Sequence, residues 1–239
     1  MGHLEGAAGH VYLDITELQA FYTSPLGRTA QMLIRARLVE AWPDLGGGVT
    51  VGFGYAGPLL RGLEGTRPPV LLMPAEQGVA RWPRGQPNRA ALADGDYLPL
   101  ADASVDRLVV CHALEHAENT RKLLREFWRV LSPEGRIMVV VPHRRSPWSF
   151  TERTPFGHGR PYSVGQVGRL LSDSLFEPAG WRGALHAPPG PLSLLRWAER
   201  PGAQLWPTLA GVLLVEAVKV VEARIDGGKL RPSLAYARA

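Results

Sequence analysis

The pattern of apolar and polar residues is clearest in residues 98–142. The short apolar run 107–111 has the composition of a buried strand. From Thr120 onward, apolar residues recur at helical spacing between charged ones, which predicts an amphipathic helix. The turn-forming residues 132–135 end that helix, and the nearly unbroken apolar run 137–141 predicts a second strand. Strand, helix and strand in this order indicate a βαβ unit, and therefore a parallel sheet covered on both faces.

The same patterns predict elements on both sides of this unit. Ser24 and Pro25 have the residue types of a helix N-cap and first turn, and Ser163 is a second candidate N-cap. The further predicted helices are 14–42, 164–175 and a short one in 192–206, and the further predicted strands are 49–51, 70–73, 91–93, 176–185 and 211–219.

A glycine-rich segment, GFGYAG at 52–57, follows the strand predicted at 49–51. Glycines allow the backbone to approach a ligand closely and to turn sharply into a helix. This spacing alone is a weak signal, and its position ahead of the βαβ unit strengthens it. Pro58 is compatible with the first turn of a helix.

Three short motifs in a fixed order resemble a known family. They are LPL-x-D-x-S-x-D at 98–106, LEH at 114–116 and RVL-x-P-x-G at 129–135, followed by an apolar strand. Together they resemble the second half of a class I methyltransferase domain, more narrowly methyltransferase type 11. The resemblance is strong over 94–142 and weaker over 49–219. It implies an α/β fold with a Rossmann-like, doubly wound, seven-stranded sheet, mostly parallel with an antiparallel edge strand, and S-adenosylmethionine as cofactor.

The resemblance also implies which residues would bind the cofactor. The glycine segment would hold its amino-acid end, and Asp94 would accept a hydrogen bond from the adenine amino group. The implied set is Gly52, Gly54, Tyr55, Gly57, Met73, Asp94 and His112.

Two positions depart from the family pattern. Thr50 stands where the family usually has an acidic residue, and Met73 stands at the strand tip where a carboxylate normally binds the ribose. Glu76 follows three residues later. Either Glu76 is a surface residue and the ribose has no carboxylate partner, or a loop returns Glu76 to the ribose.

The loop after the strand 107–111 carries the candidate catalytic residues. Ligands of open parallel sheets sit at the carboxyl ends of the strands, so His112 is expected beside the cofactor. His112 and His116 are the candidate bases, and Glu115 could orient a substrate. The HALEH segment lacks the H-E-x-x-H pattern, so no metal site is predicted.

Candidate acceptor-binding residues come from three segments: Tyr22 near the first helix, Trp82 in an arginine- and proline-rich loop, and His158, Arg160 and Tyr162 in a glycine-rich loop. Each has a structural alternative. The first helix could simply pack on the sheet, Trp82 could fill a gap in the core, and the third loop could be a lid without a ligand.

Composition narrows the class of protein. The 239 residues carry a formal net charge of +5, but the basic residues are scattered, which disfavours nucleic acid as a partner. The single cysteine, Cys111, lies in a predicted buried strand, which fits a reducing, cytoplasmic location. No apolar run reaches about 18 residues, so no membrane span is expected. The first ten residues lack the apolar core of a signal peptide and include a candidate cloning remnant.

We expect one methyltransferase-like domain over 11–219, with an N-terminal helical cap at 11–45. Residues 220–239 are polar and basic, and they predict either a flexible tail or an arm that binds a protein partner.

Two functions follow. The first is S-adenosylmethionine-dependent methyl transfer to a small-molecule acceptor. The alternative is a catalytically degenerate fold that serves as a protein-binding or regulatory subunit, which rests on the departures at Thr50 and Met73.

Overall fold

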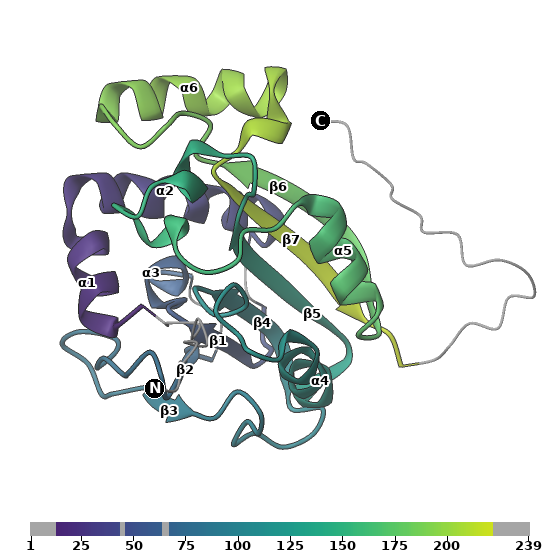
Figure 1. Cartoon of the computed structure of the whole chain (residues 1–239). Coiled ribbons are helices and arrows are strands. Elements are labelled where there is room, and N and C mark those ends of the chain that lie inside the picture. The colour runs from purple at the N-terminus through teal and green to yellow at the C-terminus, as the bar shows by residue number, and fades with distance from the viewer. Residues whose placement is uncertain (1–12, 44–45, 64–66, 222–239) are drawn as a thin grey trace, which may run out of the picture.

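The computed structural model of the chain describes residues 13–43, 46–63 and 67–221 (Figure 1). The first ten residues lie outside this part, as does the chain from residue 222 onward. The predicted role of the tail therefore stays a prediction, as do the domain bounds 11–219.

One seven-stranded sheet forms the centre of the protein (Figure 1). Its strands are β1 (Thr50–Gly54), β2 (Val70–Pro74), β3 (Ala90–Ala93), β4 (Val105–Cys111), β5 (Leu131–Pro142), β6 (Phe176–Ala184) and β7 (Val212–Lys219). They lie in the order β3-β2-β1-β4-β5-β7-β6. Strands β1 to β5 are parallel, whereas β7 is antiparallel to both β5 and β6. This confirms the predicted mostly parallel sheet; β7 lies one position in from the edge strand β6.

Helices cover both faces of this sheet. They are α1 (Ile15–Thr23), α2 (Pro25–Ala41), α3 (Gly57–Leu60), α4 (Thr120–Val130), α5 (Val164–Ser172) and α6 (Leu192–Leu205), with short 3₁₀ helices η1 (Pro147–Phe150), η2 (Pro155–Gly157) and η3 (Pro207–Leu209). Buried residues of α1, α2, α3 and α6 share one core with the sheet. Those of α4 and α5 share the core on the opposite face.

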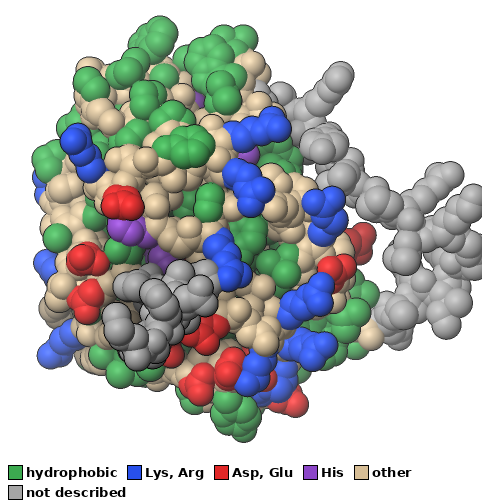
Figure 2. Space-filling view, in the orientation of Figure 1, with side chains coloured by type: hydrophobic (Ala, Val, Ile, Leu, Met, Phe, Trp, Pro, Cys, Tyr) green, Lys and Arg blue, Asp and Glu red, His purple; other side chains and the backbone are tan. Residues whose placement is uncertain are grey.

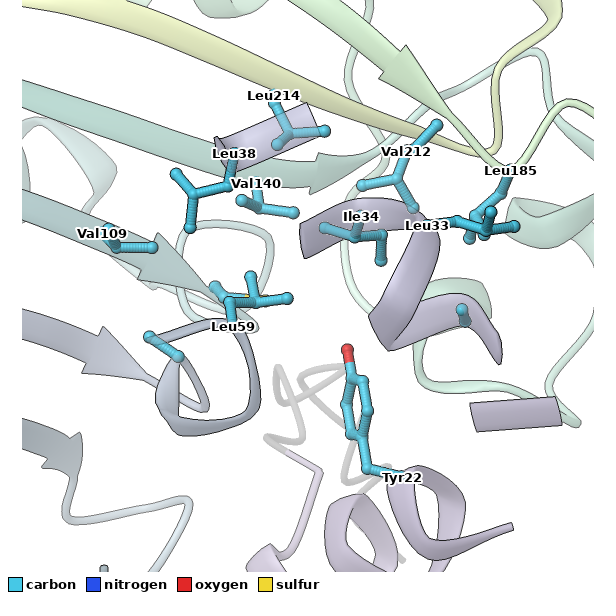
Figure 3. Close-up of a cluster of buried hydrophobic side chains, with 14 of the residues drawn as sticks. Tyr22, Leu33, Ile34, Leu38, Leu59, Val109, Val140, Leu185, Val212 and Leu214 are labelled. Carbon is cyan, nitrogen blue, oxygen red and sulfur yellow. The ribbon is translucent and has the colours of Figure 1, made fainter. Parts of the chain in front are cut away.

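The two cores follow from the alternation of side chains along each strand. In β4, Val109 and Cys111 belong to the core under α2, whereas Leu108 and Val110 belong to the core under α4. Figure 3 shows the first of these cores, with side chains of β4, β5 and β7 facing Ile34 and other residues of α2. A strand buried on both faces explains the unbroken apolar runs of the sequence.

The start of β5 differs from the expected turn at residues 132–135. Leu131 leaves α4 and pairs at once with Val105, and the register then shifts so that Arg107 pairs with Arg136. The predicted turn is therefore wrong, because these residues form an irregularity inside the strand, with Glu134 at φ 60°. The Leu131 N–H donates to the Phe127 carbonyl oxygen and its own carbonyl accepts from Lys219 Nζ, so the backbone is satisfied where the side chain is fully buried.

The N-terminal helix and the glycine segment also differ in detail. Ser24 divides the expected helix 14–42 into α1 and α2, and its side chain accepts a hydrogen bond from the Gly27 amide (3.0 Å). The predicted N-cap is thus confirmed. Gly52 and Gly54 belong to β1 itself rather than to a loop after it.

On the face that Figure 2 shows, basic side chains lie singly or in small groups, as the scattered arginines of the sequence indicate. Among the described residues, no helix is both long and apolar enough to span a membrane.

Candidate functional site

The carboxyl ends of four parallel strands bring predicted cofactor residues to one edge of the sheet. Gly54 at the end of β1 pairs with Cys111 at the end of β4, and Pro74 of β2 pairs with Ala93 of β3. His112 directly follows Cys111. The glycine segment and the end of β4 therefore lie side by side.

The glycines of β1 and α3 are required by packing within the chain. A Cβ atom on Gly54, whose φ is +74°, would lie 2.3 Å from the Cys111 carbonyl oxygen. On Gly57 it would lie 3.0 Å from the indole of Trp82, and on Gly52 it would meet leucine side chains at 2.5 and 2.8 Å. The space beside these glycines is thus filled by the protein, and their role toward a cofactor stays a prediction.

A buried polar cluster follows β4. His112, Glu115 and His116 are each only 1% exposed. A hydrogen bond of 2.8 Å joins His112 Nε2 to the Tyr22 hydroxyl from α1, and His112 Nδ1 lies 3.4 Å from Glu115 Oε1. The Phe156 ring lies 5.0 Å from the His112 ring. Two predicted residues, Tyr22 and His112, are thereby brought into direct contact.

The charges in this cluster are set by its composition. Burial by itself disfavours a charged ring, but the Cys111 sulfur and the Glu115 carboxylate outweigh it and raise the pKa of His112 to about 10. Burial likewise favours a neutral Glu115, yet the adjacent His112 ring and the nearby His116 lower the pKa of its carboxyl group. His112 therefore carries a proton at neutral pH, opposite an ionised Glu115.

Gln77 was not anticipated from the sequence and covers the same edge. Its side chain is fully buried, and its amide nitrogen donates to the His112 carbonyl oxygen at 2.8 Å. The backbone carbonyl oxygen of Gln77 accepts a hydrogen bond from the Ile15 backbone amide, also at 2.8 Å, and this bond holds the start of α1 beside Gln77. No sequence signal marked Gln77, because its partner lies 35 residues away.

A cavity of about 190 Å³ opens at the ends of β2 and β3. Asp94 and Glu76 both line it, together with Asp96 and the N-terminal end of α4. Glu76 is an exposed residue, as one alternative expected, but the loop after β2 also returns it to the neighbourhood of Asp94. Two carboxylates thus stand where the family resemblance expects the adenosine.

A larger cavity, of about 610 Å³, lies between α1, α3 and the loop after β2. Five of the predicted residues line it: Tyr22, Tyr55, Gly57, Met73 and Trp82. Trp82 also packs against the core at its margin, as its structural alternative expected, and its role toward an acceptor stays a prediction.

The remaining acceptor candidates lie on a different side of the polar cluster. The Arg160 amide donates to the Glu115 carbonyl oxygen (2.8 Å), and the Tyr162 hydroxyl donates to the Leu114 carbonyl oxygen (3.3 Å). His158 instead contacts the Glu152 carbonyl through Nε2 (2.9 Å). This loop therefore covers residues 112–116, and none of its three candidates lines the larger cavity.

Comparisons with known proteins agree with this arrangement. Residues 69–139 match a family described as "Methyltransferase domain". A probable S-adenosylmethionine-dependent methyltransferase of Mycobacterium tuberculosis is 37% identical over 111 residues, which are 46% of this chain and 39% of that protein. A probable S-adenosylmethionine-dependent methyltransferase of Mycolicibacterium smegmatis is 36% identical over 109 residues, 45% of this chain and 41% of its own. The chain therefore spans about two fifths of the length of these curated relatives.

Solved structures resemble the whole fold. A crystal structure of an S-adenosylmethionine-dependent methyltransferase from Thermotoga maritima superposes with a TM-score of 0.60 at 17% identity, over 86% of this chain and 96% of that one. A methyltransferase from Aquifex aeolicus gives 0.56 at 15% identity, over 87% and 100%. These identities bear on the fold alone. The chain therefore resembles S-adenosylmethionine-dependent methyltransferases in sequence over residues 69–139 and in fold over most of its length.

Proposed function

We propose that this protein binds S-adenosylmethionine at the carboxyl edge of its sheet and transfers a methyl group to a small-molecule acceptor. The observation that carries the proposal is the cavity in which Asp94 and Glu76 meet, at the ends of β3 and β2. Carboxylates accept the strong, charge-assisted hydrogen bonds that an adenine amino group and ribose hydroxyls can donate. When bound, the cofactor supplies an already activated methyl group, so the protein mainly aligns and desolvates the acceptor.

The residues present fit the two halves of the cofactor unequally. Asp94 and Glu76 suit the adenosyl half. At the end of β4, the Gln77 side chain donates a hydrogen bond to the His112 carbonyl oxygen, and the Tyr22 hydroxyl is hydrogen-bonded to the His112 ring. The amino-acid half of the cofactor therefore fits only if Gln77 releases the His112 carbonyl. Thr50, which replaces the usual acid, is buried, and its hydroxyl has no hydrogen-bond partner among the described residues.

The polar cluster indicates which side chain could accept a proton. A ring that already carries a proton at neutral pH is no base, and the pKa of His112 is raised to about 10. Of the two candidate bases, His116 is therefore the one that we assign to any acceptor that must lose a proton, a role that it can perform only while its own ring is neutral. His112 then positions Tyr22 and Glu115, and the loop at Gly159, which lies against the His116 ring, keeps water away from it.

Two observations support a small-molecule acceptor. The cavity of about 610 Å³ falls within the roughly 300–1,000 Å³ of pockets that bury small ligands. It also reaches Tyr22, whose hydroxyl contacts His112, so an occupant would end beside the polar cluster.

Titration calorimetry with S-adenosylhomocysteine tests the proposal. We expect Asp94→Ala to weaken binding by roughly ten- to a hundredfold, because a lost hydrogen bond to a carboxylate costs about 1.5–3 kcal/mol. Asp173→Ala, the same substitution at an exposed residue that follows α5 and lines neither cavity, is the matched control and should bind like wild type. A folded wild-type protein that shows no binding at millimolar ligand would contradict the proposal and favour a non-catalytic subunit.

A further inference from the structure

Two crossovers with little helix leave part of one sheet face uncovered. Parallel strands are usually joined through helices that cover the sheet. Here the described residues of the β1–β2 connection contain only the four-residue helix α3, and the β2–β3 connection, residues 75–89, contains no helix. The cavity of about 610 Å³ occupies this gap, against Leu71 and Met73 of β2.

Four arginines line the cavity: Arg61, Arg81, Arg84 and Arg89. No Asp or Glu is among its described lining residues. Arg81 and Arg89 each donate to neutral oxygens of Gln86, at 3.3 and 3.0 Å. Elsewhere on the surface, arginines such as Arg129 and Arg136 pair with carboxylates.

None of the four cavity arginines has such a carboxylate among the described residues. Clustered guanidinium groups without anions repel one another, and a bound oxyanion would relieve that repulsion. The guanidinium fork also matches phosphate and carboxylate geometry.

Aromatic side chains form a wall of the same cavity. Trp82 lies against Gly57, where any Cβ would come within 3.0 Å of its indole, and the rings of Tyr22 and Tyr55 lie 5.3 Å apart between centroids, tilted by 37°. Burial raises the pKa of the Tyr55 hydroxyl, and the Arg84 charge opposes that rise. The positive charge of Arg84 therefore acts at the aromatic wall. Such a wall suits a flat or apolar body.

We propose that this cavity binds an organic oxyanion, an apolar or aromatic body that carries a phosphate or carboxylate group. The arginines hold the anionic group, and the body lies along Trp82 and Tyr55 toward Tyr22. Because Tyr22 contacts His112, this ligand is the methyl acceptor. Only that last assignment rests on the proposed methyl transfer; the binding site itself does not.

Calorimetric titration of the full chain with phenyl phosphate, without cofactor, tests the site. We expect wild type to bind phenyl phosphate and Arg84→Gln to bind it about tenfold more weakly, because the variant loses a hydrogen bond between charged groups. The double variant Arg81→Gln/Arg84→Gln should bind more weakly still. Phenol, which has the same ring without the charge, should not bind. Tighter binding of phenyl phosphate than of benzoate assigns a phosphate ligand, and the reverse order assigns a carboxylate.

The matched control is Arg125→Gln, which removes the same charge from an exposed position of α4 on the other face of the sheet. It should bind phenyl phosphate like wild type. Trp82→Ala should reduce the advantage of phenyl phosphate over inorganic phosphate. Melting curves of each variant show that it is folded.

Equal losses in Arg84→Gln and Arg125→Gln would overturn the site, because they indicate attraction by the net charge alone. Absence of phenyl phosphate and benzoate binding at millimolar concentration, by a folded protein, would overturn it as well. A titration with S-adenosylhomocysteine on the same samples separates the two proposals. If the protein binds the oxyanion but not the cofactor, the proposed oxyanion site is supported and the proposed methyl transfer is contradicted.

Discussion

At the scale of single residues, the buried pair of His112 and Glu115 governs how stability depends on pH. The folded protein holds a proton on His112 up to a pKa of about 10, whereas an unfolded histidine releases it near 6.5. The stability that the protonated His112 adds to the folded state is fully present below pH 6.5 and is lost as pH rises toward 10. The unfolding free energy should fall there by up to about 1.4 kcal/mol per pH unit, as urea unfolding at several pH values measures.

Glu115→Gln should flatten this slope, because the ring loses its anionic partner and burial then favours the neutral form. Glu177→Gln, at an exposed position of β6, is the control and should keep the wild-type slope. Equal slopes in all three proteins would show that His112 is neutral in the folded state. On the acid side, the lowered pKa of Glu115 gives stability that is lost as pH falls through the carboxyl range.

At the scale of elements, the β2–β3 connection is held over the sheet edge by Gln77. Gln77→Ala leaves the buried His112 carbonyl without this donor and should lower the unfolding free energy by about 1–3 kcal/mol. The same change uncovers the edge, so S-adenosylhomocysteine should bind severalfold more tightly. Urea unfolding and calorimetry measure the two effects on one sample.

The exposed Gln204→Ala in α6 provides the comparison and should alter neither quantity. If Gln77→Ala instead weakens the binding of S-adenosylhomocysteine, Gln77 forms part of the cofactor site rather than covering it.

Helix α5 offers a test of a local signal. Ser163 and Gln166 form a capping box, in which each side chain bonds the backbone of the other. Ser163→Ala should cost about 0.5–2 kcal/mol of stability, measured by thermal or urea unfolding. Ser172→Ala, the same substitution at the exposed far end of the helix, should change little. A similar loss in both variants would mean that α5 depends on general packing and not on its cap.

At the scale of the whole molecule, the affinity for the cofactor depends on the free energy needed to move Gln77 away from the carboxyl edge of the sheet. We expect S-adenosylhomocysteine to bind with a dissociation constant on the order of 10 μM to 1 mM, or about −7 to −4 kcal/mol, since part of its binding free energy must displace Gln77. At 5 mM ligand and a constant near 100 μM, the linked stabilisation is about 2.3 kcal/mol. A protein of this size should then melt roughly 5–9 °C higher. A submicromolar dissociation constant for S-adenosylhomocysteine would show that displacing Gln77 from the sheet edge costs no binding free energy.

The sequence by itself determined the elements and their order. Helix α4 follows from the spacing of Leu123, Phe127 and Val130, which are buried as that spacing predicts. The N-caps Ser24 and Ser163 follow from residue type alone. These signals are local, because capping and amphipathic periodicity involve residues only a few positions apart. Motif order also predicted the parallel sheet and placed Asp94 near its edge.

Only the tertiary structure decided what surrounds that edge. The Tyr22–His112 hydrogen bond joins residues 90 positions apart, and no periodicity encodes it. The contact of Gln77 with the same histidine, the ionised Glu115 and the return of Glu76 beside Asp94 depend likewise on how loops cross the sheet. The arginine-lined cavity lies where the described parts of two crossovers hold one short helix, and such a space appears only when the elements are packed in three dimensions.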